Sequence, residues 1–239
     1  GEDRVESYFA IRSLEVKKVG AWPRLCLNGK PYFFHGLLDQ GYWPESLLTP
    51  PAPESYVDDI LAMKKLGFNT LRKHIKVEME EFYYQCDKLG MIVFQDMVNN
   101  GDYSFLRDTA LPTVGLKSLP DRYLHRDPAT REAFIQGMEE TVAQLREHPC
   151  ICCWTIFNEG WGQFDSDNMY RRLKALDSSR FIDTASGWFR GAPSDVDSHH
   201  VYFKPVKLKR SDKPIFLSEF GGYVYRDEEH VFNPDKTYG

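Results

Sequence analysis

The chain has 239 residues, with 30 Lys and Arg against 35 Asp and Glu, and a formal net charge of −5. This length suffices for one large domain or two small ones with a sizeable core. The acidic balance argues against a nucleic-acid partner, whose phosphates require a basic face. No apolar run approaches the roughly 18–20 residues of a membrane span, so we expect no membrane partner. The composition, 42% hydrophobic and 27% charged, excludes wholesale disorder.

The N-terminal segment alternates apolar and polar residues between positions 7 and 16, with Phe9, Ile11, Leu14 and Val16 as its apolar members. This alternation predicts a half-buried β-strand. No partner strand is recognisable nearby in the sequence. We therefore assign residues 1–26 to the remnant of a preceding domain and a linker, and residues 27–239 to a second domain.

After residue 30, short apolar segments alternate with helical patterns. Apolar segments predict strands at residues 32–38, 68–72, 91–95, 151–157, 181–184, 198–202 and 214–218, and helical patterns lie at 54–66, 79–90, 128–148 and 167–176. Gly67 and Gly90 are expected to end the first two helices, and Asp127 to cap the third. Strands alternating with helices imply right-handed βαβ units and a parallel sheet.

The helices predict which faces are buried. In the first, Val57, Ile60 and Leu61 share one face, and in the second Met79, Phe82, Tyr83 and Cys86 recur at helical spacing. Seven strands are one fewer than a closed (β/α)₈ barrel contains. We therefore expect an α/β fold, a TIM barrel that stops before its eighth strand, and little activity from these residues by themselves.

Three of the five cysteines stand close together, at Cys150, Cys152 and Cys153, in an apolar run. We interpret them as small buried hydrophobic residues. A zinc site is the alternative, but no second cysteine pair stands at ligand spacing, and we expect no metal and no other cofactor. Free thiols favour a reducing compartment, so the expected location is the cytoplasm.

In a parallel barrel the functional groups lie at the carboxyl ends of the strands. These positions hold Asp39, Arg72 with His74 just beyond, Asp96, Asn158 with Glu159, His200 with Tyr202, and Glu219. Two glutamates at the ends of the fourth and seventh strands indicate glycoside hydrolysis, which needs a carboxyl group on each side of the anomeric carbon. A separation of about 5–5.5 Å makes one of them a nucleophile and the enzyme retaining.

Other residues at these ends fit supporting roles. Arg72 is expected to keep Glu219 ionised, and Tyr202 to donate a hydrogen bond to it. The Asn158 amide suits a sugar 2-hydroxyl. Trp161 and Trp188 follow strands and suit stacking on sugar faces, although each could also pack the upper barrel layer. Arg72 is likewise compatible with a structural ion pair, Asp96 with a capping group at the end of the barrel, and His200 and Tyr202 with core positions.

Four motifs carry a family resemblance. Asn-Glu-Gly-Trp-Gly-Gln-Phe at 158–164, Gly-Phe-Asn-Thr-Leu-Arg-Lys-His at 67–74, Cys-Asp-Lys-Leu-Gly at 86–90 and Leu-Ser-Glu-Phe-Gly at 217–221 resemble the catalytic barrel of glycoside hydrolase family 2. That family holds β-galactosidases, β-glucuronidases and β-mannosidases. The likeness extends from Leu27 to Glu219 with the motifs in the family's order. By the same resemblance, the N-terminal strand is similar to the end of the immunoglobulin-like domain that precedes this barrel.

The resemblance implies roles residue by residue. Glu159 would be the acid/base and Glu219 the nucleophile. Arg72, Asn158 and Tyr202 would support them, and His74, His200 and Asp39 would lie in the sugar pocket.

This sequence also departs from the family's pattern. The magnesium-dependent β-galactosidases place a Glu and a His shortly after the third strand, where residues 94–100 here read Phe-Gln-Asp-Met-Val-Asn-Asn, so that metal site is not expected. Residues 37–44 differ from the usual loop of the galactosidase and glucuronidase branches and look closer to poorly characterised bacterial members. No particular sugar is therefore predicted.

The leading hypothesis is a retaining β-glycosidase that hydrolyses terminal β-linked sugars, with a carbohydrate as its partner and a homo-oligomer left open. One alternative is a clan-related endo-acting glycanase of the mannanase or cellulase type, which would share both glutamates. Another is a catalytically silent carbohydrate-binding barrel, which would need neither glutamate. A metal-dependent hydrolase is disfavoured because the candidate histidines, His74, His148, His199 and His200, do not fall on one set of strand ends.

Overall fold

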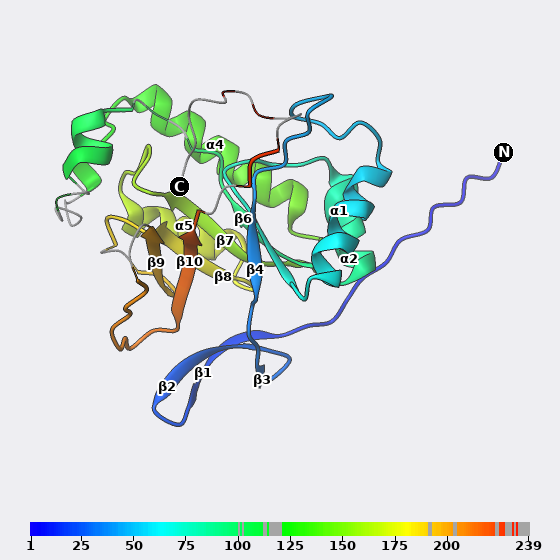
Figure 1. The fold of residues 1–239 in the computed structure, drawn as a ribbon, viewed down its shortest axis with the longest axis horizontal. Coiled ribbons are helices and arrows are strands. Elements are labelled where there is room, and N and C mark those ends of the chain that lie inside the picture. Colours follow the sequence, from blue (N-terminus) through cyan, green and yellow to red (C-terminus); the bar gives the residue numbers. More distant parts are fainter. Residues whose placement is uncertain are drawn as a thin grey trace.

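The computed structural model describes residues 1–99, 101, 103–111, 114, 121–190, 193–202, 205–222, 225–227, 231 and 233. Within these residues a small antiparallel sheet precedes an α/β body (Figure 1). The parallel strands of the body are β4 (Gly36–Asp39), β5 (Thr70–Lys73), β6 (Ile92–Asp96), β7 (Ile151–Asn158), β8 (Phe181–Ser186), β9 (Asp197–Tyr202) and β10 (Ile215–Gly221). All seven predicted strand regions therefore contain a strand.

Strand order follows chain order, as in the wall of a TIM barrel. Strands β4 to β8 form one five-stranded parallel sheet, and β9 pairs in parallel with β10. The loop before β9 attaches to β8, because Asp195 N–H donates to the Ile182 carbonyl oxygen and Ile182 N–H donates to the Asp195 carboxylate, both at 2.9 Å. The second sheet therefore continues the wall of the first.

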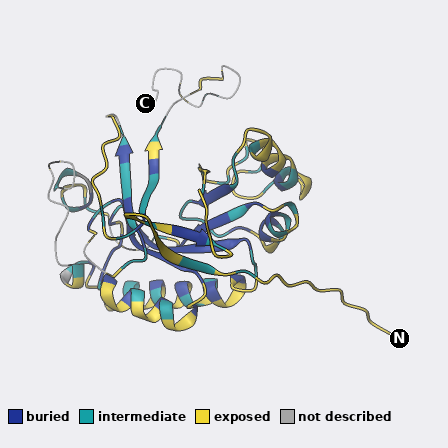
Figure 2. Cartoon of the chain, turned by 90° about the horizontal axis from the view of Figure 1, so that it is seen from below, coloured by how far each residue is buried: buried dark blue, intermediate teal, exposed yellow. Residues whose placement is uncertain are grey.

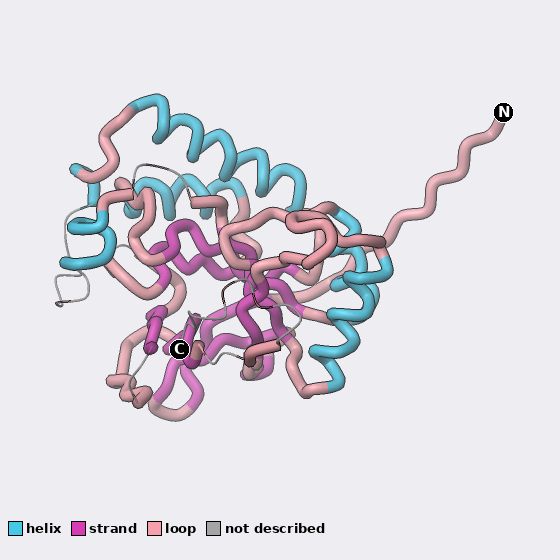
Figure 3. Tube along the Cα trace, turned by 45° about the horizontal axis from the view of Figure 1, so that its top comes forward, coloured by secondary structure: helices cyan, strands magenta, loops and turns pink. Residues whose placement is uncertain are grey.

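Four α-helices of the described chain lie outside the strands (Figure 3). They are α1 (Glu54–Lys65), α2 (Glu80–Leu89), α4 (Pro128–Leu145) and α5 (Ser166–Leu176), with the shorter turns η1 (Phe105–Ala110) and η2 (Asp121–Tyr123) between β6 and α4. The predicted ends are confirmed for three of them. Helix α1 ends just before Gly67, which is in the left-handed region at φ 94°. Gly90 ends α2 in the left-handed region at φ 72°, and the Asp127 side chain caps α4 by accepting from Thr130 N–H at 2.8 Å. The longest of these helices is too polar to span a bilayer, and the others are too short.

The buried helix faces differ slightly from those predicted. Phe82, Tyr83 and Cys86 of α2 are buried as expected, but Met79 is exposed because it precedes the first turn and does not share that face. In α1 the buried residues are Tyr56 and Ile60, whereas Leu61 is exposed. The buried face of α1 is therefore rotated by about one residue from the predicted one. The prediction did not count Tyr56 as apolar, because its aromatic ring carries a hydroxyl.

Strands β5 to β8 form the buried centre of the molecule, and the helices expose their outer faces (Figure 2). Every residue of β7 is buried, as expected for a parallel strand covered on both sides. All five cysteines are free and buried, and burial raises the pKa of Cys152 to about 11. The interpretation of the three clustered cysteines as buried hydrophobic residues is confirmed.

The N-terminal prediction was partly wrong. The strand there is β1 (Leu14–Val19), and it pairs antiparallel with β2 (Trp22–Leu27), which in turn pairs with β3 (Lys30–Pro31). A partner strand therefore does lie nearby in sequence. Residues 7–13 lie outside the strand, where Phe9 and Ile11 are 84% and 90% exposed. The assignment of residues 1–26 to a preceding domain stays a prediction.

The loop between α5 and β8 offers a stability prediction. Burial opposes ionisation of Asp177, but hydrogen bonds from Ser179 and from Trp154 Nε1 (2.9 Å), with the charge of Arg180, lower its pKa to about 2. A lowered folded-state pKa stabilises the protein above the unfolded value of about 3.9 and ceases to do so as the pH falls through about 2. We expect Asp177→Asn to reduce the free energy of unfolding by about 2 kcal/mol at pH 7 and by about half of that at pH 3.

Urea unfolding at the two pH values measures this difference. Asp167→Asn is the matched control, since Asp167 lies on the exposed side of α5 with a side chain 56% exposed. An Asp177→Asn effect of the same size at both pH values would contradict the prediction.

Candidate active site

Arg72 links the carboxyl ends of four strands. Its side chain is 4% exposed, and its Nε and Nη2 donate to the two carboxylate oxygens of Asp96, each at 3.0 Å. Nη2 also donates to Asn158 Oδ1 at 2.8 Å, and Nη1 donates to Glu219 Oε1 at 2.9 Å. Although burial opposes the charge, Asp96 and Glu219 raise the pKa of Arg72 above its usual range. A permanent cation therefore holds β5, β6, β7 and β10 together.

Glu219 lies on β10 and is 6% exposed. The register of β10 against β9 shifts between Leu217 and Glu219, an irregularity of the kind that re-aims a side chain. Both carboxylate oxygens accept hydrogen bonds, Oε1 from Arg72 and Oε2 from the Tyr202 hydroxyl at 2.6 Å. The structure thus shows the Arg72 and Tyr202 contacts expected from the sequence, and this environment suits a carboxylate.

Glu159 directly follows β7 in a strained backbone conformation. Its φ is 52°, in the left-handed region that non-glycine residues rarely adopt. A Cβ on the next residue, Gly160, would lie 2.3 Å from the ring of Phe189, so only glycine fits this turn. The Glu159 side chain is 19% exposed, against 5% for that of Glu219. The two glutamates therefore differ both in accessibility and in surroundings.

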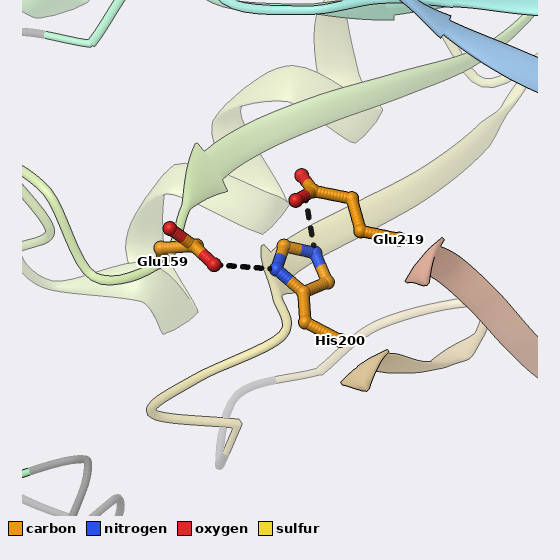
Figure 4. Close-up of side chains that lie close together, drawn as sticks. All are labelled: Glu159, His200 and Glu219. Carbon is orange, nitrogen blue, oxygen red and sulfur yellow. Dashed lines mark hydrogen bonds and ion pairs between the residues drawn. The ribbon is translucent and has the colours of Figure 1, made fainter. Parts of the chain in front are cut away.

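His200 lies between the two glutamates (Figure 4). Its Nδ1 is 2.9 Å from Glu159 Oε1, and its Nε2 is 3.5 Å from Glu219 Oε1. Burial lowers the pKa of His200 to about 3, so the ring is neutral at physiological pH. A Cβ on residue 187 would lie 2.4 Å from His200 Cγ, so the His200 ring can occupy this position only because residue 187 is a glycine.

Glu159, His200 and Glu219 also form a group that could hold a metal ion. One ligand-type atom from each lies within 4.8 Å of the others. However, Arg72 Nη1 lies 2.9 Å from Glu219 Oε1 and 3.3 Å from His200 Nε2. Because Glu219 Oε1 and His200 Nε2 already face a guanidinium, the group suits an anionic carboxylate and a neutral ring better than a bound cation.

His74 completes this cluster. Its Nε2 lies 3.1 Å from Asn158 Nδ2 and 3.8 Å from Glu219 Oε1, and its side chain is 13% exposed. The fold thus brings together seven of the residues predicted for the site: Arg72, His74, Asn158, Glu159, His200, Tyr202 and Glu219.

Asp39 is not brought to this cluster. In the strand register Asp39 pairs with Lys73, whereas Leu38 pairs with Arg72. Because successive side chains of a strand point to opposite faces, Asp39 lies on the other side of the sheet from Arg72. There its carboxylate forms a 2.9 Å ion pair with Lys73, which also lies over the ring of Phe82 on α2.

The two tryptophans lie in the loops directly after strands. Trp161 follows β7, is 37% exposed and packs edge-on against Tyr103 at 6.1 Å between ring centroids. Trp188 follows β8, and its backbone N–H donates to the Ser186 carbonyl oxygen at 3.0 Å. Contact of either indole with a sugar stays a prediction.

Two residues of the cluster were not in the predicted site. The sequence offers Asp96 as a strand-end carboxylate that is also compatible with a capping group, and the structure makes it the bidentate partner of Arg72. Ser186 was missed because the fifth barrel strand was predicted to end at residue 184, whereas β8 continues to Ser186. Its hydroxyl lies 2.9 Å from His200 Nε2. The small residues Ala185 and Ser186 directly follow the predicted strand and could have indicated that it continues to residue 186.

Comparison with known proteins agrees with this architecture. The family model described as "Glycosyl hydrolases family 2, TIM barrel domain" matches residues 18–222. The chain belongs to this family. A β-galactosidase of Aeromonas hydrophila is 32% identical over 194 residues, which are 80% of this chain and 17% of that protein. A β-galactosidase of Klebsiella pneumoniae is 28% identical over 193 residues, 80% of this chain and 16% of that protein.

Solved structures of two glycosidases share the fold. The β-galacturonidase from Eisenbergiella tayi bound to galacturonate superposes with a TM-score of 0.66 at 19% identity, over 93% of this chain and 42% of its own. A β-D-glucuronidase from Dictyoglomus thermophilum gives 0.63 at 18% identity, over 82% and 33%. The predicted family and barrel-type fold are therefore confirmed, and the chain spans 16% and 17% of the length of the two β-galactosidases.

Proposed function

We propose that the chain carries the catalytic centre of a retaining β-glycosidase that removes terminal β-linked sugars. The observation that carries this proposal is the pairing of Glu159 with Glu219, whose facing carboxylate oxygens lie within 4.8 Å of each other. Retaining glycosidases hold their two carboxyl groups about 5–5.5 Å apart, whereas inverting enzymes leave room for a water at about 6.5–9.5 Å. The 4.8 Å limit applies to the nearest oxygens rather than to the carboxyl groups as a whole, and a gap this small between oxygens favours the closer spacing of the retaining class.

The surroundings of the two glutamates support distinct roles. Glu219 accepts from the Arg72 cation and the Tyr202 hydroxyl, which stabilise a carboxylate ready to attack the anomeric carbon. Glu159 is more exposed and contacts the neutral ring of His200, a setting that suits a group whose proton is exchanged in each half-reaction. We assign Glu219 as the nucleophile and Glu159 as the acid/base.

In the first step Glu219 forms a bond to the anomeric carbon while the glycosidic C–O bond breaks, and Glu159 gives its proton to the leaving oxygen. In the second step Glu159 takes a proton from water as the water oxygen bonds to the anomeric carbon and the bond to Glu219 breaks. Glu219 loses its charge in the covalent intermediate. Arg72 then still has both oxygens of Asp96, so the intermediate leaves no unpaired buried cation.

A panel of 4-nitrophenyl β-glycosides tests this function in the full-length protein. The names of the relatives suggest the galactoside, the glucuronide and the galacturonide as first members. Proton NMR of the first-formed sugar should show the β-anomer. Initial release of the α-anomer would contradict retention, and turnover of long oligosaccharides alone would favour an endo-acting glycanase.

A further inference from the structure

Ser186 supports the backbone of Glu159. It ends β8, next to the point where Glu159 leaves β7, and no part of it is exposed to solvent. Its carbonyl oxygen accepts the Glu159 N–H at 3.0 Å and also the Trp188 N–H at 3.0 Å. Because Glu159 has a φ of 52°, its conformation persists only where surrounding contacts hold it. The Ser186 carbonyl provides one such contact.

The Ser186 side chain reaches Glu159 by a second route. Its Oγ lies 2.9 Å from His200 Nε2, and the opposite ring nitrogen of His200 lies 2.9 Å from Glu159 Oε1. The same hydroxyl contacts Ser198 Oγ at 3.1 Å and Ser218 Oγ at 3.0 Å. The three serines thus form a hydroxyl cluster beneath the His200 ring, and Ser186 is the member that contacts the ring.

The charges around His200 determine which ring nitrogen carries the hydrogen. The ring is neutral because burial lowers its pKa to about 3, so it has one N–H. Arg72 Nη1 points at Nε2 from 3.3 Å, and a guanidinium can only donate. Nε2 is therefore the acceptor, and Nδ1–H donates to Glu159 Oε1. The Ser186 hydroxyl has a single hydrogen, for which Nε2 at 2.9 Å and Ser218 Oγ at 3.0 Å compete. Donation to Nε2 is favoured because it keeps two lone pairs from facing each other at 2.9 Å.

We propose that Ser186 is a positioning residue for Glu159. Its carbonyl oxygen holds the strained backbone of Glu159, and its hydroxyl, together with Arg72 Nη1, keeps His200 in the tautomer that donates from Nδ1 to Glu159 Oε1. With Oε1 accepting this hydrogen bond, the acid form of Glu159 carries its proton on Oε2. This inference rests on the proposed role of Glu159 as the acid/base.

Ser186→Ala removes the hydroxyl and keeps the carbonyl. Ser198→Ala is the matched control, because Ser198 is 2% exposed and its hydroxyl contacts the same cluster through Ser186 and Ser218. Both variants lose one buried hydroxyl of equal size. The substrates are 2,4-dinitrophenyl and methyl β-glycosides of the sugar identified by the panel. A dinitrophenolate departs without protonation, whereas methanol needs a proton from Glu159.

Loss of one hydrogen bond of about 1 kcal/mol corresponds to roughly a fivefold change in rate. We expect Ser186→Ala to lower kcat/KM about fivefold for the methyl glycoside and less than about twofold for the dinitrophenyl glycoside. Ser198→Ala should change kcat/KM by the same factor for both substrates. A Ser186→Ala loss that is the same for both leaving groups, or is matched by Ser198→Ala, would show a merely structural role and overturn the proposal.

A second measurement does not depend on turnover. Nitrogen-15 NMR of histidine-labelled protein, with His200 assigned from a His200→Gln variant, reports the protonation of each ring nitrogen. In the unsubstituted protein His200 should carry its hydrogen on Nδ1, and the Nε2 signal should move in Ser186→Ala but not in Ser198→Ala. Unmoved His200 signals in Ser186→Ala overturn this inference. A lack of turnover across the panel overturns the proposed function, and the NMR result still decides whether Ser186 controls His200.

Discussion

Replacing Glu219 with glutamine is expected to lower kcat/KM by at least about 10,000-fold on every β-glycoside that the protein cleaves. An amide has nearly the same shape as the carboxylate, but it cannot form the covalent bond to the anomeric carbon. The amide oxygen can still accept from Arg72, and Asp96 still balances its charge, so the fold should survive. Steady-state kinetics together with thermal unfolding by circular dichroism would measure both effects.

Glu78→Gln is a suitable control for this loss. Glu78 is also a buried glutamate, 5% exposed, and it forms a 2.8 Å ion pair with Lys73 on the side of the sheet away from Arg72. Glu78→Gln should lower the free energy of unfolding, because the ion pair with Lys73 is lost. It should not remove turnover, because Lys73 keeps its ion pair with Asp39 and the site lies on the other side of the sheet. Substantial activity of Glu219→Gln on any glycoside would exclude Glu219 as the nucleophile.

Replacing Glu159 with alanine is expected to give the second-largest loss, with a dependence on the leaving group. For a methyl glycoside kcat/KM should fall by about 100- to 10,000-fold, the range that positioned proton transfer contributes. For a dinitrophenyl glycoside the first step should be nearly unaffected, and the covalent intermediate should accumulate because no base activates water. Stopped-flow release of dinitrophenolate would then show a burst followed by slow turnover.

Azide distinguishes the roles of the two glutamates. It needs no base and fits the space left by the Glu159 side chain, so added azide should speed Glu159→Ala and yield the β-glycosyl azide. In Glu219→Ala the nucleophile itself is missing, and azide should attack the substrate directly to yield the α-glycosyl azide. An α-product from Glu159→Ala, or a β-product from Glu219→Ala, would show that the two roles are assigned the wrong way round.

The cluster could be predicted from sequence because parallel strands end at one edge of the sheet. Arg72, Asn158 and Glu219 are far apart in the chain, but each stands at the carboxyl end of a predicted strand. Once the alternation of strands and helices indicated a barrel, these ends had to converge. The Arg72–Glu219 and Tyr202–Glu219 contacts followed from charge and hydrogen-bonding complementarity alone.

Features that depend on strand register were harder to predict. Asp39 is one residue from the position that would face Arg72, and a one-residue difference in a strand reverses the face. Ser186 was excluded by a strand end placed two residues early. The β1–β2 pairing was not predicted. A hairpin is recognised from a turn between two segments that alternate apolar and polar residues, and the segments on either side of the turn at Gly20 show little such alternation.

The contacts of Arg72 also bear on how the molecule folds. The hydrogen bond from Arg72 to Glu219 joins residues 147 positions apart, whereas that to Asp96 spans only 24. Contacts between distant residues require the closure of long loops before they contribute any free energy. A chain in which β4 to β8 have formed but β10 has not docked would contain Arg72, Asp96 and Asn158 in place and still lack Glu219. By this reasoning the Arg72–Glu219 contact, and catalytic competence with it, is expected to form after the Arg72–Asp96 pair.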